Sequence, residues 1–177
     1  MASERPRRQA SAYLSQAAPH PQAKEDRPIA RARDHGPLVI ASNRLPVQVS
    51  TDDTGHLELA PSSGGLVSAV RAIGDEFSWI GWPGAAVEPG QEAELRARLG
   101  ADGLHPVFLD QTDESDYYGR ICNETLWPLF HYFVGRMSFT DVAWQRYVEV
   151  NERFADEIAA SSPQGARVWV HDFHLML

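Results

Sequence analysis

The stretch LVIASNRLP, residues 38–46, decides the fold class of this 177-residue chain. Its first four residues are apolar, and a short apolar run of this kind is typical of a strand buried in a parallel sheet. Similar runs follow at residues 77–81, 106–109 and 168–170, and helical patterns separate them. Strands that alternate with helices predict an α/β fold with a Rossmann-like parallel sheet.

The segments between these runs predict one hairpin and four helices. Residues 47–50 and 56–59 flank a turn-forming segment, which is typical of a β-hairpin. Residues 92–99 carry acidic and basic side chains four apart, Glu92 with Arg96 and Glu94 with Arg98, as on a surface helix. The other expected helices cover residues 62–74, the segment from Thr112 or Asp113 to Pro128, and residues 141–160.

The first 36 residues differ in composition from the rest of the chain. They contain few large aliphatic side chains, seven of the 16 Lys and Arg residues and four of the 24 Asp and Glu residues. Such a segment buries too little apolar surface to offset its ordering entropy, so residues 1–36 are expected to form a disordered leader. The remainder, residues 37–177, then carries a formal charge of -11.

This acidic remainder argues against general nucleic-acid binding, because the phosphate backbone attracts basic surfaces. No apolar run approaches the roughly 20 residues of a membrane span, so no membrane partner is expected. Cys122 is the only cysteine, which excludes an internal disulfide and a multi-cysteine zinc site. The sequence therefore predicts a cytoplasmic protein.

Parallel sheets bind ligands at the carboxyl ends of their strands, so the residues that follow the runs are candidates for a site. Arg44 follows the first run, where its guanidinium could hold a phosphate or form an ordinary surface ion pair. Gly64 and Gly65 precede an expected helix, as in an anion-binding loop or a plain tight turn. They do not form G-x-G-x-x-G, so a nicotinamide dinucleotide is not expected.

The stretch YYGRICNETLWPLFHY, residues 117–132, combines aromatic rings with hydrogen-bonding groups. A polyol site needs this mixture, because flat rings cover C–H faces while donors and acceptors hold hydroxyls. The motif HDFH, residues 171–174, has a spacing that resembles a metal site with His131 as third ligand. The carboxylate of Asp172 more naturally holds sugar hydroxyls, or offsets positive charge at a reacting carbon, unless it caps a turn.

Six blocks occur in a fixed order: SNRLP, SGGL, WIGWPG, the aromatic stretch, a Trp-Tyr-Val-Asn pattern at residues 144–151, and VWVHDFHL. Together they closely resemble the N-terminal region of trehalose-6-phosphate synthases, the retaining glycosyltransferases of family 20. The resemblance implies a GT-B enzyme, in which two Rossmann-like domains face each other across a cleft. Residues 37–177 would form part of the N-terminal, acceptor domain, and the C-terminal donor domain would be absent.

The resemblance also implies a role for each motif residue. Arg44 would hold the phosphate of glucose 6-phosphate, and Trp82, Tyr118 and Trp127 would line the acceptor site. Asp172 would hold acceptor hydroxyls near the transferred group, which makes it the catalytic candidate, and Gly64 and Gly65 would approach the diphosphate of UDP-glucose. No metal or cofactor is implied.

The implied reaction is glucosyl transfer from UDP-glucose to glucose 6-phosphate, which gives trehalose 6-phosphate and UDP. The groups that neutralise the leaving diphosphate lie outside the region of resemblance, so the chain alone is expected to be inactive. Two alternatives remain: a related glucosyltransferase with another phosphorylated acceptor, such as glycerol 3-phosphate, and a non-catalytic module that binds a sugar phosphate. The resemblance leaves open a homo-oligomeric full-length enzyme.

Overall fold

The structure is a computed structural model that describes residues 36–52, 56–62 and 77–177. The expected leader and the expected helix over residues 62–74 lie almost wholly outside the described residues. Gly64 and Gly65 lie outside them as well. No helix in the described ranges is long and apolar enough to cross a membrane.

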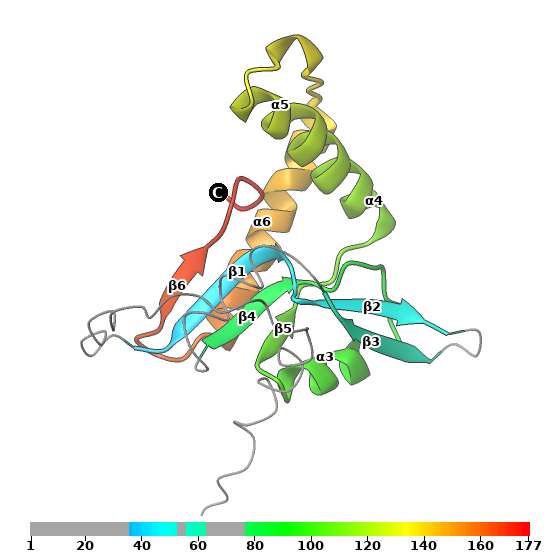
Figure 1. Ribbon diagram of the computed structural model, residues 1–177, viewed down its shortest axis with the longest axis vertical. Helices are drawn as coiled ribbons and strands as arrows, with labels where there is room; N and C mark the ends of the chain where they lie inside the picture. The colour runs from blue at the N-terminus through cyan, green and yellow to red at the C-terminus, as the bar shows by residue number, and fades with distance from the viewer. Residues whose placement is uncertain (1–35, 53–55, 63–76) are drawn as a thin grey trace, which may run out of the picture.

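Four parallel strands form the central sheet in the order β5-β4-β1-β6 (Figure 1). They are β1 (Leu38–Arg44), β4 (Phe77–Trp82), β5 (Leu104–Pro106) and β6 (Arg167–Val170). The first strand in the chain lies in the interior of the sheet, so its carboxyl end meets those of β4 and β6. The parallel order confirms the predicted α/β fold and places the polar residues after the strands along one edge.

The strand expected at residues 106–109 lies earlier in the chain. β5 pairs with β4 through Leu104, His105 and Pro106, and only the N–H of Val107 continues the pattern, donating to the Gly81 carbonyl at 2.9 Å. Val107 and Leu109 are nevertheless buried in the core. The apolar pattern therefore predicted burial correctly, but it did not predict which residues pair.

The predicted hairpin is confirmed as an antiparallel pair, β2 (Val47–Thr51) and β3 (Leu57–Pro61). It packs on one face of the sheet together with helix α3 (Glu92–Gly100). Of the two ion pairs expected on this helix, Glu94 with Arg98 forms at 3.5 Å. Arg96 instead reaches Glu157 at 2.8 Å, because a partner from another helix lies closer than Glu92.

Helix α6 (Asp141–Ser161) packs on the other face of the sheet, as expected, and extends beyond the strand ends (Figure 1). Two long helical segments lie side by side there, and α6 is one of them. The other runs without a break through α4 (Gln111–Asp113), the π-helical η1 (Glu114–Leu126) and α5 (Trp127–Phe130).

The start and end of this second segment differ from the prediction. Asp110, rather than Thr112 or Asp113, is its N-cap, and Asp110 and Asp113 form a reciprocal capping box. Pro128 does not end the segment, which continues to Phe130. The carbonyl of Glu124, which the missing N–H of Pro128 would leave unbonded in an α-helix, accepts the N–H of Ser138 at 3.0 Å.

Candidate functional site

Arg44 and Trp82 are paired in register as the last residues of β1 and β4. The guanidinium carbon of Arg44 lies 4.5 Å from the ring centroid of Trp82, and the indole is fully buried beneath it. The Arg44 side chain is itself exposed, and no carboxylate of the described residues pairs with it. The strand ends therefore present an oriented and unneutralised cation, which is suited to a phosphate.

Gly84 leaves room for the guanidinium of Arg44 because it has no side chain. A Cβ atom at Gly84 would lie 2.8 Å from the Nη1 atom of Arg44, and the backbone there has φ +89°, which L side chains rarely adopt. The loop after β4 therefore needs glycine at this position both for its own conformation and for the position of Arg44.

The Gly84→Ala variant is expected to bind an anionic ligand of Arg44 about tenfold more weakly, because the guanidinium must move and the loop must adopt a strained conformation. Isothermal titration calorimetry with inorganic phosphate measures this affinity. Gly90→Ala is the matched control, since a Cβ there meets nothing within 4 Å. Equal affinities for the two variants would show that Gly84 does not position Arg44.

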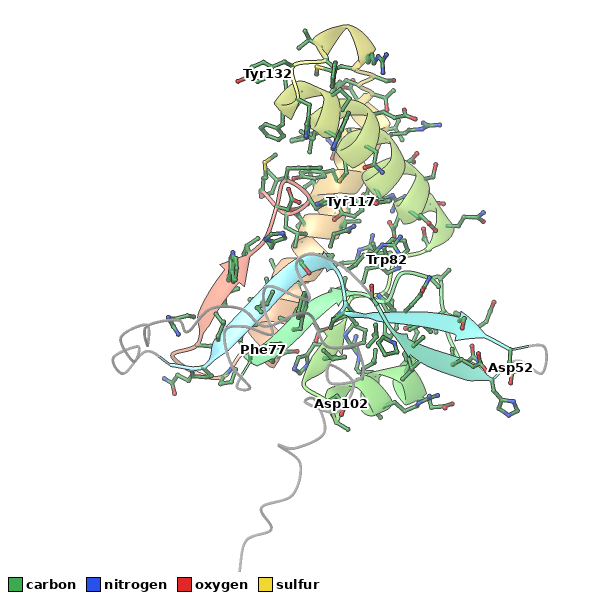
Figure 2. All side chains as sticks on the ribbon, in the orientation of Figure 1. Asp52, Phe77, Trp82, Asp102, Tyr117 and Tyr132 are labelled. Carbon is green, nitrogen blue, oxygen red and sulfur yellow. The ribbon has the colours of Figure 1, made fainter. Side chains whose placement is uncertain are left out.

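Tyr118 on η1 brings the helical segment to the same strand ends. Its ring centroid lies 6.2 Å from that of Trp82 and 5.6 Å from the guanidinium carbon of Arg44. A buried hydrogen bond of 2.9 Å from the Tyr117 hydroxyl to Asn43 Oδ1 fixes η1 beside the end of β1 (Tyr117 and Trp82 are labelled in Figure 2). The structure thus brings Arg44, Trp82 and Tyr118 together.

The loop that follows β6 carries Asp172 and contacts the group through His174. The ring of His174 stacks on Tyr118 with a centroid distance of 5.9 Å and an angle of 18°. Asp172 has φ 75°, and its Oδ1 atom accepts the N–H of Phe173 at 2.7 Å. Its side chain remains 41% exposed, so the carboxylate can still accept hydrogen bonds from a ligand.

Trp127 lies apart from these residues on α5. Its ring stacks on His131 with a centroid distance of 4.2 Å and an angle of 19°, and the His131 Nδ1 atom lies 2.7 Å from the Trp127 carbonyl oxygen. The indole is 43% exposed. Trp127 is therefore available to a ligand, but its ring contacts are local and none joins it to Arg44, Trp82 or Tyr118 among the described residues.

Two residues of α6 that received no role from the sequence anchor the loop of Asp172. The Tyr147 hydroxyl donates to the Phe173 carbonyl at 2.8 Å and accepts the N–H of Met176 at 3.2 Å. Asn151 Nδ2 donates to the His174 carbonyl at 3.2 Å, and its Oδ1 accepts the N–H of Leu177 at 3.2 Å. A Tyr and an Asn on the buried face of a helix are the only local signal for this arrangement.

Tyr147→Phe is expected to lower the free energy of unfolding by about 1–3 kcal/mol, because two hydrogen bonds to partly buried backbone groups are lost. Urea unfolding followed by tryptophan fluorescence measures it. The control is Tyr132→Phe, whose ring is 91% exposed and which is expected to be neutral. The same loss in both variants would contradict the anchoring role.

A metal site at residues 171–174 finds no support in the part of the chain that the structure describes. His131 stacks on Trp127 rather than joining His171 and His174, and no three His, Cys, Asp or Glu side chains there could hold a metal ion. The described residues instead form a cation on an aromatic platform, with a second aromatic ring and an exposed carboxylate.

A model of glycosyltransferase family 20 matches residues 36–177. The chain therefore belongs to glycosyltransferase family 20. This result confirms the resemblance seen in the motifs.

The relatives bear the name that the motifs suggested. An alpha,alpha-trehalose-phosphate synthase [UDP-forming] A of Dictyostelium discoideum is 40% identical over 143 residues, which are 80% of this chain and 20% of the relative. The 56 kDa subunit of the synthase of Kluyveromyces lactis is 42% identical over 146 residues, 80% of this chain and 30% of the subunit. The chain thus spans less than a third of the length of these relatives.

Solved structures of such synthases share the fold. One from Burkholderia xenovorans in complex with glucose-6-phosphate has a TM-score of 0.57 and 26% identity, and covers 79% of this chain and 29% of its own. One from E. coli bound with UDP-2-fluoro glucose has a TM-score of 0.54 and 28% identity, with coverages of 78% and 28%.

Proposed function

We propose that the protein containing this chain transfers glucose from UDP-glucose to glucose 6-phosphate, with formation of trehalose 6-phosphate and UDP. In this proposal the described residues supply the acceptor half of the site. The observation that carries it is the exposed guanidinium of Arg44, which lies on Trp82 without a carboxylate partner among the described residues. A planar fork of donors on an aromatic platform suits a phosphate monoester.

The remaining residues fit the sugar of this acceptor. The exposed carboxylate of Asp172 would accept hydrogen bonds from hydroxyls. Tyr118 contacts both Arg44 and His174, and His174 lies in the same loop as Asp172. The half-exposed ring of Trp127 would cover a C–H face of the sugar. Trp82 is fully buried, so it would act on the acceptor chiefly through the Arg44 guanidinium that lies on its ring.

The chemistry then depends on position and charge. Arg44 and Asp172 would fix the two ends of the acceptor, so that its reacting hydroxyl meets the donor sugar in one orientation. The Asp172 carboxylate would also stabilise positive charge that develops at the reacting carbon. Gly64 and Gly65 remain the proposed contacts to the diphosphate of UDP-glucose.

Calorimetric titration of the 177-residue chain with glucose 6-phosphate, glucose and glycerol 3-phosphate tests this proposal. Glucose 6-phosphate is expected to bind most tightly, because it alone offers both a phosphate for Arg44 and a ring for Tyr118, Trp127 and Asp172. Preferential binding of glycerol 3-phosphate would favour the related glucosyltransferase. Release of UDP from UDP-glucose and glucose 6-phosphate by this chain would contradict the expectation that the chain alone is inactive.

A further inference from the structure

His174 is a buried side chain to which the proposed reaction assigns no role. Its side chain is 15% exposed, and its Nδ1 atom is buried without a hydrogen-bond partner among the described residues. The nearest charged group is the Asp172 carboxylate, whose Oδ2 atom lies 3.9 Å away. This distance is too long for a hydrogen bond, but it is short enough for a strong interaction if the imidazole becomes charged.

The ring of His174 stands in a column of planar groups. It stacks on Phe173 at 4.4 Å and 20°, and on Tyr118 at 5.9 Å and 18°. Tyr118 in turn lies beneath the guanidinium of Arg44. His174 therefore packs against Tyr118, which is one of the two aromatic rings that the Arg44 guanidinium lies on.

The surroundings of His174 favour its neutral form. Burial lowers the pKa of His174, the Asp172 carboxylate opposes this effect, and His171 adds to it. Tyr118 faces His174 from η1, with the Arg44 guanidinium beyond it, and α6 contributes only uncharged groups, the amide of Asn151 and the hydroxyl of Tyr147. Asp172 is thus the one anion beside the imidazole among the described residues.

We propose that His174 is a positioning residue of the acceptor site, which in its neutral form supports Tyr118 and leaves the Asp172 carboxylate free for the ligand. A proton on His174 draws that carboxylate to the imidazole and adds a positive charge to the column below Arg44. Acidification then weakens acceptor binding through Asp172. The identity of the acceptor rests on the proposed function, whereas the coupling between His174 and Asp172 does not.

Side-chain NMR of histidine in the labelled chain tests the coupling without a ligand. The His174 imidazole is expected to titrate below the ordinary histidine value of about 6.5. Asp172→Asn is expected to lower its midpoint further, by about one pH unit, because the anion that stabilises the charged imidazole is removed. An unchanged midpoint in Asp172→Asn would overturn the proposal.

Binding of glucose 6-phosphate between pH 7.5 and 5.5 tests the consequence for the site. At pH 7.5, His174→Phe keeps the stack and is expected to bind like the original chain, while His174→Ala binds about threefold to tenfold more weakly.

On acidification the original chain is expected to lose more affinity than His174→Phe, because only the original chain has an imidazole to protonate at this position. Protonation of the phosphate weakens binding equally in both proteins. Parallel pH profiles would overturn the proposal. Absence of binding at every pH would refute the proposed function, while the NMR titration would still decide the coupling.

Discussion

The Arg44→Ala variant is expected to bind glucose 6-phosphate about 100-fold more weakly than the original chain. Two charge-assisted hydrogen bonds to the phosphate are lost, at about 1.5 kcal/mol each or more, and about 3 kcal/mol corresponds to this factor. Arg44→Lys is expected to lose about tenfold, because an ammonium keeps the charge but lacks the planar fork that lies on Trp82.

Two controls define this prediction. Arg96→Ala removes an arginine that pairs with Glu157 away from the strand ends, so it is expected to leave the affinity unchanged. Weak binding of glucose, which has no phosphate, should be the same in Arg44→Ala as in the original chain. If Arg44→Ala weakens glucose and glucose 6-phosphate equally, Arg44 does not bind the phosphate.

The Arg153→Leu variant is expected to lose about 3 kcal/mol of unfolding free energy, which is the largest stability effect we predict. Asp113 is fully buried, and its two oxygens accept hydrogen bonds from Arg153 at 2.6 and 2.8 Å. Without Arg153, the carboxylate keeps the N–H of Asp110 and an ion pair of 3.6 Å with Arg146. These two partners leave a buried charge incompletely compensated.

The matched control is Arg120→Leu, which breaks a more exposed ion pair with Asp116 on the same helical segment. Exposed pairs contribute about 0–1 kcal/mol, so a small effect is expected. Urea unfolding of both variants provides the comparison. A loss in Arg153→Leu no larger than that in Arg120→Leu would contradict the account of Asp113.

The pH dependence of this effect has a definite sign. Burial alone would raise the pKa of Asp113, but hydrogen bonds from Arg153 and the Asp110 backbone, with the charges of Arg153 and Arg146, hold the pKa below its ordinary value. The stabilisation is therefore complete above the unfolded-state pKa of about 3.9 and is lost as the pH falls through the lower folded-state value. The stability difference between the original chain and Arg153→Leu should shrink as the pH falls below about 4.

Local patterns predicted β1, β4 and β6 because parallel strands are continuous apolar runs, although β6 lies at the edge of the sheet and its residues Val168, Trp169 and Val170 are exposed. These patterns failed where a distant partner decides the outcome. The helical segment passes Pro128, where Ser138 donates to the Glu124 carbonyl, and β5 begins at Leu104, which pairs with Trp79. Neither partner is visible in a local window.

In the candidate site, too, local sequence predicted some residues, while contacts between distant segments decided the others. Arg44, Trp82, Tyr118 and Asp172 were predicted from their positions after strands and from the motifs, and the structure gathers them. Their contacts with a ligand stay predictions, as do those of Trp127, Gly64 and Gly65. The positioning roles of Gly84, Tyr147, Asn151 and His174 were not predicted, because a through-space contact defines each of them.

Glucose 6-phosphate is expected to bind at the ends of β1 and β4, beside Tyr118 and Asp172. Amide and indole NMR shifts of the labelled chain, recorded during a titration with glucose 6-phosphate, measure this binding residue by residue. We expect saturable shifts that centre on Arg44, Gly84 and Asp172 and on the Trp82 indole, while helix α3 stays unchanged. Saturable shifts that centre elsewhere, or none at millimolar ligand, would contradict it.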